Sequence, residues 1–235
     1  MSRPTALVVA APGTNRDHDV AYALELAGAR ATIVPIEQLA RTPSMLAQVQ
    51  MLVVPGGFSH ADALGAGRMF ALSLAELARH ELAEFVAAGK PVLGICNGFQ
   101  TLVRAGLLPG ALGHNAGGGF QCEWVTLDAP AGVCVWTRDV EPIDCPIAHG
   151  EGRYVHADIT ALEMAGQIAL RYRSNPNGSQ ADIAGVCDPS GVVLGLMPHP
   201  ENHVVSRQHP RRTRGDQGGL GLQLFERGVA HAESM

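Results

Sequence analysis

The sequence has few charged residues, few aromatic residues and no long apolar run. Only 17% of its 235 residues are charged and the formal net charge is −5, which argues against an obligate nucleic-acid binder or membrane-surface protein. No apolar run approaches the ~20 residues that a transmembrane helix needs. The length suits one sizeable core, and we expect residues 1–235 to form a single domain.

Cysteine is also scarce, and its spacing carries no pairing pattern. An odd count without a Cys-x-x-Cys pair predicts neither a disulfide framework nor a zinc knuckle, and a reducing, cytoplasmic environment fits best. The apolar stretch 5–11 imitates a signal peptide but is too short, so we interpret it as a buried first strand. The five cysteines are Cys96, Cys122, Cys134, Cys145 and Cys187.

Short apolar runs alternate with helix-like segments through the first hundred residues. This alternation is typical of a parallel sheet covered by helices on both faces, and it predicts an α/β fold with a mostly parallel central sheet. The predicted strands are 7–10, 31–35, 51–54 and 91–95. The predicted helices are 19–28, with Asp17 or Asp19 as its cap, and 69–88.

After residue 120 the chain changes to short strands punctuated by glycine and proline, which predicts a small antiparallel extension. The predicted strands are 122–127, 133–136, 168–172, 183–186 and 192–197, and a closing helix is predicted at 222–229. Residues 202–219 have the composition of a loop. Its arginines form either a solvated surface or a contact with a partner or a phosphate; they are Arg207, Arg211, Arg212 and Arg214.

The most informative segment is residues 92–100, which read VLGICNGFQ. An apolar run ends at Cys96 between Gly94 and Gly98, the pattern of a nucleophile elbow with cysteine in place of serine. The glycines leave room for a strained turn, which a cysteine that only fills space does not require. A thiol attacks as thiolate, a form favoured at a helix N-terminus or beside an imidazole. We therefore predict that Cys96 is a nucleophile.

The segment 197–201, MPHPE, supplies a base. The prolines on both sides hold His199 in extended backbone, where Glu201 projects to the same side and can orient the imidazole as the third member of a triad. His203 completes a His-x-Glu-x-His run, but the prolines keep these side chains off successive helical turns, so no metal site is expected. Other histidines without a spacing signal are expected to be solvated: His18, His60, His80, His209 and His231.

Acyl transfer also needs hydrogen-bond donors for an oxyanion. By the geometry of an elbow, one donor is the backbone amide of Asn97. The carboxyl ends of parallel strands share one edge of a sheet, so the turn at Gly56 and Gly57 is expected beside Cys96. Gly57 is the candidate second donor; the simpler interpretation is an ordinary turn between a strand and a helix.

The combination Gly-Ile-Cys-Asn-Gly-Phe-Gln with a later Pro-His-Pro-Glu resembles the triad-type (class I) glutamine amidotransferases. Further blocks narrow the resemblance to the glutaminase subunits of phosphoribosylformylglycinamidine synthase. They occur in order as PGTN at 12–15, PGGFS at 55–59, GLLPGAL at 106–112, AHGEGR at 148–153, NPNGS at 175–179 and LGLMPHPE at 194–201. The chain departs from the family pattern at His60-Ala61-Asp62, where Tyr-Gly-Asp is expected, and the basic segment after Glu201 has no counterpart in it.

The resemblance implies a flavodoxin-like three-layer sandwich and hydrolysis of glutamine to glutamate and ammonia. Cys96 would form a glutamyl thioester, with His199 as general acid and base and Glu201 orienting it. The ammonia would pass to a large synthetase subunit, often joined by a small third subunit, that makes formylglycinamidine ribonucleotide from formylglycinamide ribonucleotide in de novo purine (IMP) biosynthesis. The implied glutamine contacts are Gly56, Phe58, Gln100, His149 and Gly150.

The sequence contains no G-x-x-x-x-G-K-[ST] loop and no dinucleotide fingerprint, so no cofactor is expected on this chain. The resemblance places ATP and magnesium on the synthetase subunit. Three alternatives stay open: a protease-like cysteine hydrolase or chaperone of the same fold, a non-catalytic regulatory module, and a glutaminase subunit for another amidotransferase. The first resembles proteins in which histidine follows the cysteine, whereas Asn97 stands there in this chain.

Overall fold

The structure is a computed structural model that describes residues 3–78, 80–215 and 218–235. Parts of the predicted helix 69–88 and of the predicted loop 202–219 lie outside the described residues, at 79 and at 216–217. Within the described ranges, no helix combines the length and the apolar character needed to span a bilayer.

A nine-stranded sheet runs through the molecule in the order β2-β1-β3-β4-β11-β10-β9-β6-β7. The first five of these strands are parallel to one another, and the last four continue the same sheet with antiparallel pairing. The α/β fold with a mostly parallel central sheet is confirmed, with the difference that the antiparallel part extends the central sheet. A separate two-stranded sheet pairs β5 (Ala111–Gly113) with β8 (Arg153–Val155).

The parallel half is built from short apolar strands. β3, β4 and β11 are buried at every position, as expected for strands covered by helices on both faces. The carboxyl ends of the parallel strands lie along one edge of the sheet, where the chain turns into the loops after β1, β3 and β4. The parallel strands are β1 (Thr5–Ala10), β2 (Arg30–Pro35), β3 (Met51–Val54), β4 (Val92–Ile95) and β11 (Val193–Leu196).

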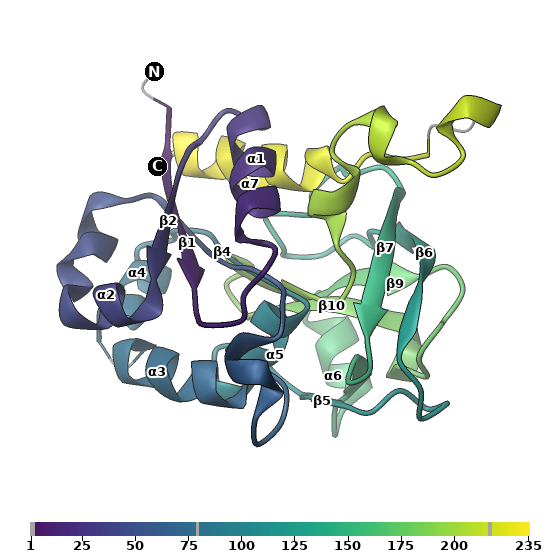
Figure 1. Ribbon diagram of the computed structural model, residues 1–235, viewed down its shortest axis with the longest axis horizontal. Coiled ribbons are helices and arrows are strands. Elements are labelled where there is room, and N and C mark those ends of the chain that lie inside the picture. Colours follow the sequence, from purple (N-terminus) through teal and green to yellow (C-terminus); the bar gives the residue numbers. More distant parts are fainter. Residues whose placement is uncertain (1–2, 79, 216–217) are drawn as a thin grey trace.

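Helices cover both faces of this half (Figure 1). Helices α1 (Asp17–Leu26) and α7 (Leu222–Glu233) pack together above the sheet, and α3 (Arg68–Ala78) and α5 (Asn97–Arg104) pack together below it. The remaining α-helices are α2 (Ile36–Arg41), α4 (Glu81–Ala87) and α6 (Ile159–Met164). These layers leave open the edge formed by the carboxyl ends of the parallel strands.

The antiparallel half contains a strand that the sequence did not predict. β7 (Ile143–His149) alternates buried and partly exposed residues, the pattern of a strand with one face on the core. Pro146 interrupts its apolar pattern, and proline is tolerated because β7 is the last strand of the sheet. The other antiparallel strands are β6 (Gln121–Asp128), β9 (Ile168–Tyr172) and β10 (Ile183–Cys187).

The predicted strand 133–136 is wrong. The segment forms turns, because its backbone amides bind the carbonyls of two glycine turns: Val133 N donates to Gly166 O and Val135 N to Gly191 O. Trp136 then enters the core, where its Nε1 donates to Val192 O at 3.0 Å. The apolar, strand-like composition of residues 133–136 therefore serves to bury Trp136 and does not form a strand.

Two helix predictions need correction. The single helix predicted at 69–88 is two helices, because α3 packs on α5 whereas α4 packs on the 3₁₀ segment Pro43–Gln48. Neither Asp17 nor Asp19 caps α1: the capping position is Arg16, without a side-chain cap. The Arg16 guanidinium instead pairs with the Asp19 carboxylate at 3.0 Å.

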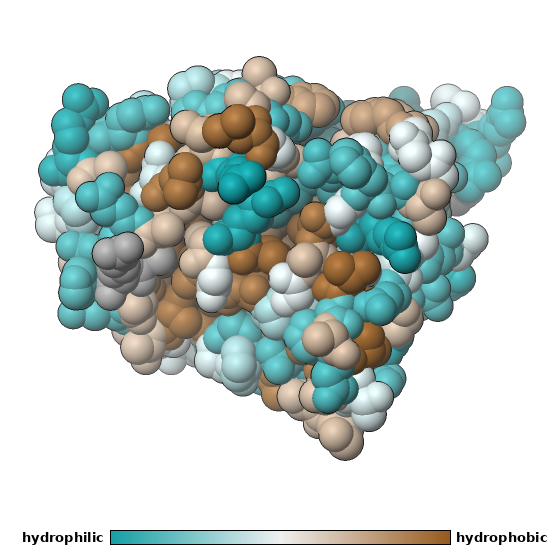
Figure 2. Space-filling view, turned by 90° about the horizontal axis from the view of Figure 1, so that it is seen from below, coloured by the Kyte–Doolittle hydropathy of each residue, from teal (hydrophilic) through white to brown (hydrophobic). Residues whose placement is uncertain are grey.

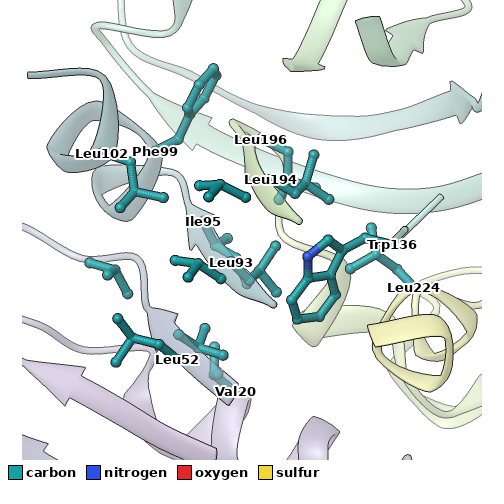
Figure 3. Packing of buried hydrophobic residues seen from close by; sticks show 14 of the residues in the cluster. Val20, Leu52, Leu93, Ile95, Phe99, Leu102, Trp136, Leu194, Leu196 and Leu224 are labelled. Carbon is teal, nitrogen blue, oxygen red and sulfur yellow. The ribbon is translucent and has the colours of Figure 1, made fainter. Parts of the chain in front are cut away.

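One continuous core extends across both halves of the sheet, and Figure 3 shows its packing around β4 and β11. Leu93 and Ile95 of β4 and Leu194 of β11 lie between the helical layers. Trp136 lies against α7, where a Cβ added to Gly228 would be 2.1 Å from the indole Cζ3. Helix α7 reaches the sheet because Gly228 has no side chain.

Replacing Gly228 with alanine tests this contact. We expect Gly228→Ala to lower the free energy of unfolding by about 1–3 kcal/mol, because the clash with Trp136 outweighs the ~1 kcal/mol by which alanine favours a helix. Urea unfolding measures the change. Gly113→Ala is the control, since nothing lies within 4 Å of its Cβ position; equal stability of wild type and Gly228→Ala would contradict the prediction.

Candidate active site

The chain turns sharply from β4 into α5 at Cys96, as the elbow pattern predicts. Cys96 has φ 51° and ψ −106°, a conformation that L-residues rarely adopt. The two predicted glycines make the turn possible. A Cβ on Gly98 would lie 1.9 Å from the Val54 carbonyl oxygen, and one on Gly94 would lie 2.8 Å from the Gly98 carbonyl oxygen.

His199 and Glu201 follow strand β11, the parallel neighbour of β4. His199 Nδ1 and Glu201 Oε1 are 2.7 Å apart and both side chains are buried, Glu201 completely. The Cys96 side chain lies close enough to the His199 imidazole to raise its pKa, and the Cys96 sulfur itself lies 3.9 Å from the Ala148 carbonyl oxygen. A Cβ on Gly56 would lie 2.8 Å from His199 Cε1 and 3.4 Å from Cys96 Cβ. Gly56 therefore gives the two side chains room to meet.

The charges around His199 favour its imidazolium form. Burial alone lowers the pKa of His199, but the negative charges of Glu201 and Cys96 and their hydrogen bonds raise this pKa to about 10. The histidine therefore carries a proton at neutral pH that it can give to a leaving group.

The turn after β3 supplies a free amide at Gly57. Phe58 N donates to Gly13 O at 3.0 Å and Asn15 N to Gly56 O at 3.4 Å, so the Gly57 amide between them takes no part in this pairing. Gly57 has φ +146°, and a Cβ there would lie 2.8 Å from Asn15 N. The Asn97 amide is the first of helix α5 and has no preceding carbonyl in the helix. Both predicted oxyanion donors are thus available.

A cavity of about 180 Å³ opens beside Cys96. This volume suits an amino acid better than a nucleotide. The sequence predicted five of its other lining residues: Gly57, Phe58, Gln100, His149 and Gly150. The sequence analysis missed Asp62, Ala66, Phe120, Ala148 and Glu151 as lining residues.

Some of the lining residues that the sequence analysis missed lie within a sequence block of the family, and others do not. Ala148 and Glu151 belong to the AHGEGR block, whereas Phe120 belongs to no motif. Phe58 and Phe120 are 49% and 58% exposed. Figure 2 views the molecule from below, and shows apolar residues near the middle of this face with polar residues around them.

His149 is held in one tautomer. Asn115 Nδ2 donates to the carbonyls of Gly119 and His149, so its Oδ1 is the acceptor that faces His149 Nδ1 at 3.1 Å. Nδ1 therefore carries the proton. Burial, together with the charge of His199, lowers the pKa of His149 to about 4, so the ring is neutral near pH 7. His149 Nε2 is buried and accepts no hydrogen bond from any residue that the structure describes.

Gln100 lies at the cavity wall with both ends of its carboxamide engaged. Its Nε2 donates to Glu151 O at 2.6 Å, and its Oε1 accepts from Asn97 Nδ2 at 3.0 Å. The side chain thereby joins helix α5 to the 148–151 loop. Direct contact between Gln100 and glutamine stays a prediction.

The loop that follows Gly57 is strained at successive residues. His60, Ala61 and Asp62 have φ of 52°, 56° and 51°, where each L-residue costs roughly 1–2 kcal/mol. This is the position at which the chain departs from the family's Tyr-Gly-Asp. Burial raises the pKa of Asp62, although its hydrogen bond with Asn97 opposes this.

Some expectations outside the site are wrong. His209 is buried against Trp124, with ring centroids 4.9 Å apart, and His231 Nε2 lies 2.9 Å from Gly89 O, so neither is simply solvated. His203 packs on Trp124 and its Nδ1 bonds Asp144 O. Cys122 is exposed, unlike the other cysteines. The four arginines at 207, 211, 212 and 214 are exposed, and residues 206–215 lie at the upper right in Figure 1.

Comparison with known proteins gives consistent matches over the whole chain. Residues 3–232 match the family described as CobB/CobQ-like glutamine amidotransferase domain. The phosphoribosylformylglycinamidine synthase subunit PurQ of Treponema denticola is 45% identical, covering 97% of this chain and 98% of that protein. The PurQ subunit of Frankia casuarinae is 47% identical, covering 93% of this chain and 90% of that protein.

The fold also matches a solved assembly. One chain in the structure of PurLQS from Thermotoga maritima superposes with a TM-score of 0.81 at 37% identity, covering 97% of this chain and 98% of that one.

Glycine at position 61 should relieve part of the strain in the loop. We expect Ala61→Gly to raise the free energy of unfolding by roughly 1 kcal/mol, since glycine adopts positive φ without a steric penalty. Urea unfolding measures the change. Ala165→Gly is the control, because Ala165 has φ −78° and should lose stability. Loss of stability in Ala61→Gly would refute the strain at this position.

The raised pKa of His199 predicts a stability change in the alkaline range. The folded state binds the proton more tightly than the unfolded state, whose pKa is near 6.5. The contribution is complete below pH 6.5 and is lost as the pH rises toward 10. Urea unfolding at pH 6, 8 and 10 should show a steeper decline for wild type than for His199→Gln; parallel declines would show that His199 does not titrate in this window.

Proposed function

This chain belongs to the CobB/CobQ-like glutamine amidotransferase family, and we propose from this premise that Cys96, His199 and Glu201 hydrolyse glutamine to glutamate and ammonia. The chain is the glutaminase subunit of a phosphoribosylformylglycinamidine synthase, an enzyme of purine biosynthesis. The observation that carries the proposed roles is the strained turn that holds Cys96 beside the buried His199–Glu201 pair.

The first half of the reaction forms a thioester. The sulfur of Cys96 attacks the side-chain carbonyl carbon of glutamine, and the carbonyl oxygen becomes an oxyanion within reach of the Gly57 and Asn97 amides. His199 gives its proton to the nitrogen as the carbon–nitrogen bond breaks, and ammonia leaves. The high pKa of His199 keeps that proton in place beforehand.

The second half hydrolyses the thioester. Neutral His199 takes a proton from water, the hydroxide attacks the same carbon, and glutamate leaves as the Cys96 sulfur is released. Glu201 holds the imidazole through the 2.7 Å contact at Nδ1, which keeps Nε2 directed to the reacting atoms. The small cavity supports an amino-acid substrate.

The ammonia is consumed on another polypeptide. The chain assembles with the large synthetase subunit and a small third subunit, as in the PurLQS structure. We assign ATP and magnesium to the synthetase subunit, which uses them to convert formylglycinamide ribonucleotide; the absence of a phosphate-binding motif in this sequence supports that assignment. A cytoplasmic location suits its free cysteines.

Glutamate release tests the proposal. The chain is mixed with its synthetase and small subunits, ATP, magnesium and formylglycinamide ribonucleotide, and glutamate is measured with and without those subunits. Wild type should release glutamate when its partner subunits are present. The rate of glutamate release by Cys96→Ala should be lower by on the order of 10⁶-fold, which is the background rate. Cys122→Ala removes an exposed thiol and should retain full activity. If wild type released no glutamate in the complete mixture, the proposed glutaminase function would be refuted.

A further inference from the structure

The side chain of Asn97 connects the elbow to the oxyanion turn through hydrogen bonds that none of the steps above requires. We propose that Asn97 is a positioning residue: its carboxamide clamps the Ser59–Asp62 turn and thereby fixes the Gly57 amide opposite Cys96. This inference rests on the proposed glutaminase function. It gives Asn97 two separate roles, since its backbone amide is also an oxyanion donor.

The hydrogen-bond partners determine which way the Asn97 carboxamide points. The Ser59 backbone amide can only donate, and it lies 3.2 Å from Oδ1; the Ser59 hydroxyl lies 2.5 Å from the same atom. On the other side, Nδ2 donates to Asp62 Oδ1 at 3.0 Å and to Gln100 Oε1 at 3.0 Å. All four contacts are consistent with one orientation, and the side chain is only 2% exposed.

The partners of Asn97 stand at the two ends of the strained segment. Ser59 precedes the run of positive φ angles and Asp62 ends it. Strained backbone persists only where surrounding contacts hold it, and one side chain here binds both ends. Without the clamp the turn can relax, and Gly57, two residues before Ser59, would move with it.

The hydrogen bonds of Asn97 also connect to the 148–151 loop, which lines another side of the cavity. Asn97 binds Gln100, and Gln100 binds the Glu151 carbonyl. One chain of hydrogen bonds therefore joins the oxyanion turn, helix α5 and the 148–151 loop, all of which line the cavity. A leucine at position 97 has nearly the same size but can make none of these bonds.

Two reactions of Cys96 separate positioning of the oxyanion donor from general damage. Glutamine hydrolysis forms an oxyanion. Alkylation by iodoacetamide forms a bond from sulfur to a methylene carbon and releases iodide, so it needs no oxyanion donor. Both rates are measured in the complete complex, in a Cys122→Ala background that removes the exposed thiol.

We expect Asn97→Leu to lower kcat for glutamine by about 10–100-fold, the range for a displaced or lost oxyanion donor, with KM within about twofold of wild type. The rate of Cys96 alkylation should stay within about twofold. Ser59→Ala should show a smaller loss of kcat. The double variant should be no slower than Asn97→Leu alone, because both changes remove the same contact.

Gln167→Leu is the matched control. Gln167 is also a buried carboxamide, with Nε2 donating to Cys187 O at 2.9 Å, but it does not line the cavity. The Gln167→Leu variant should have a lower melting temperature than wild type and an unchanged kcat for glutamine. The clamp is refuted if Asn97→Leu keeps wild-type kcat, if alkylation slows in parallel with hydrolysis, or if the Ser59 and Asn97 effects are additive. Absence of hydrolysis by wild type, with normal alkylation, would instead refute the glutaminase function itself.

Discussion

The contact between Gly98 and the Val54 carbonyl is the constraint on which the site depends. A Cβ on Gly98 would lie 1.9 Å from that oxygen, so helix α5 can begin directly against the end of strand β3 only without a side chain there. This close approach tilts the chain at Cys96 into positive φ and sets the Asn97 amide at the start of the helix. It also brings the Asn97 side chain within hydrogen-bond distance of Ser59.

The sequence was sufficient to predict most of the parallel half of the fold and the geometry at the triad. Short apolar runs bounded by turn residues predicted β3 and β4, because strands buried on both faces have no alternation to obscure them. The run at 192–197 was predicted as a strand of the antiparallel extension, whereas β11 pairs in parallel with β4. Cys96 in an elbow and His199 bonded to Glu201 followed from local backbone rules for glycine and proline. The catalytic roles of these residues stay predictions until they are measured.

Features that depend on distant contacts were not predictable. Segment 133–136 has strand-like residues, yet its backbone pairs with turns at Gly166 and Gly191. Strand β7 was hidden by Pro146, whose tolerance depends on its place at the sheet edge. The partners of Asn97 in the oxyanion turn, Asp62 and Ser59, lie 35 and 38 residues earlier in the chain, so the contact to that turn has no local signal. His209 was predicted to be solvated, because its edge-to-face contact with Trp124 likewise joins segments that are far apart in the sequence.

The position of β11 in the sheet has a consequence for synthesis of the protein. β11 lies between β4 and β10, although it is the last strand to be made, and it carries His199 directly after it. A ribosome-bound chain that ends before β11 already contains the thiol and the oxyanion turn but lacks both the base and the central strand that positions it. If His199 is the base, as proposed, such a nascent chain cannot hydrolyse glutamine, and ammonia production begins only after β11 has been made and paired with β4.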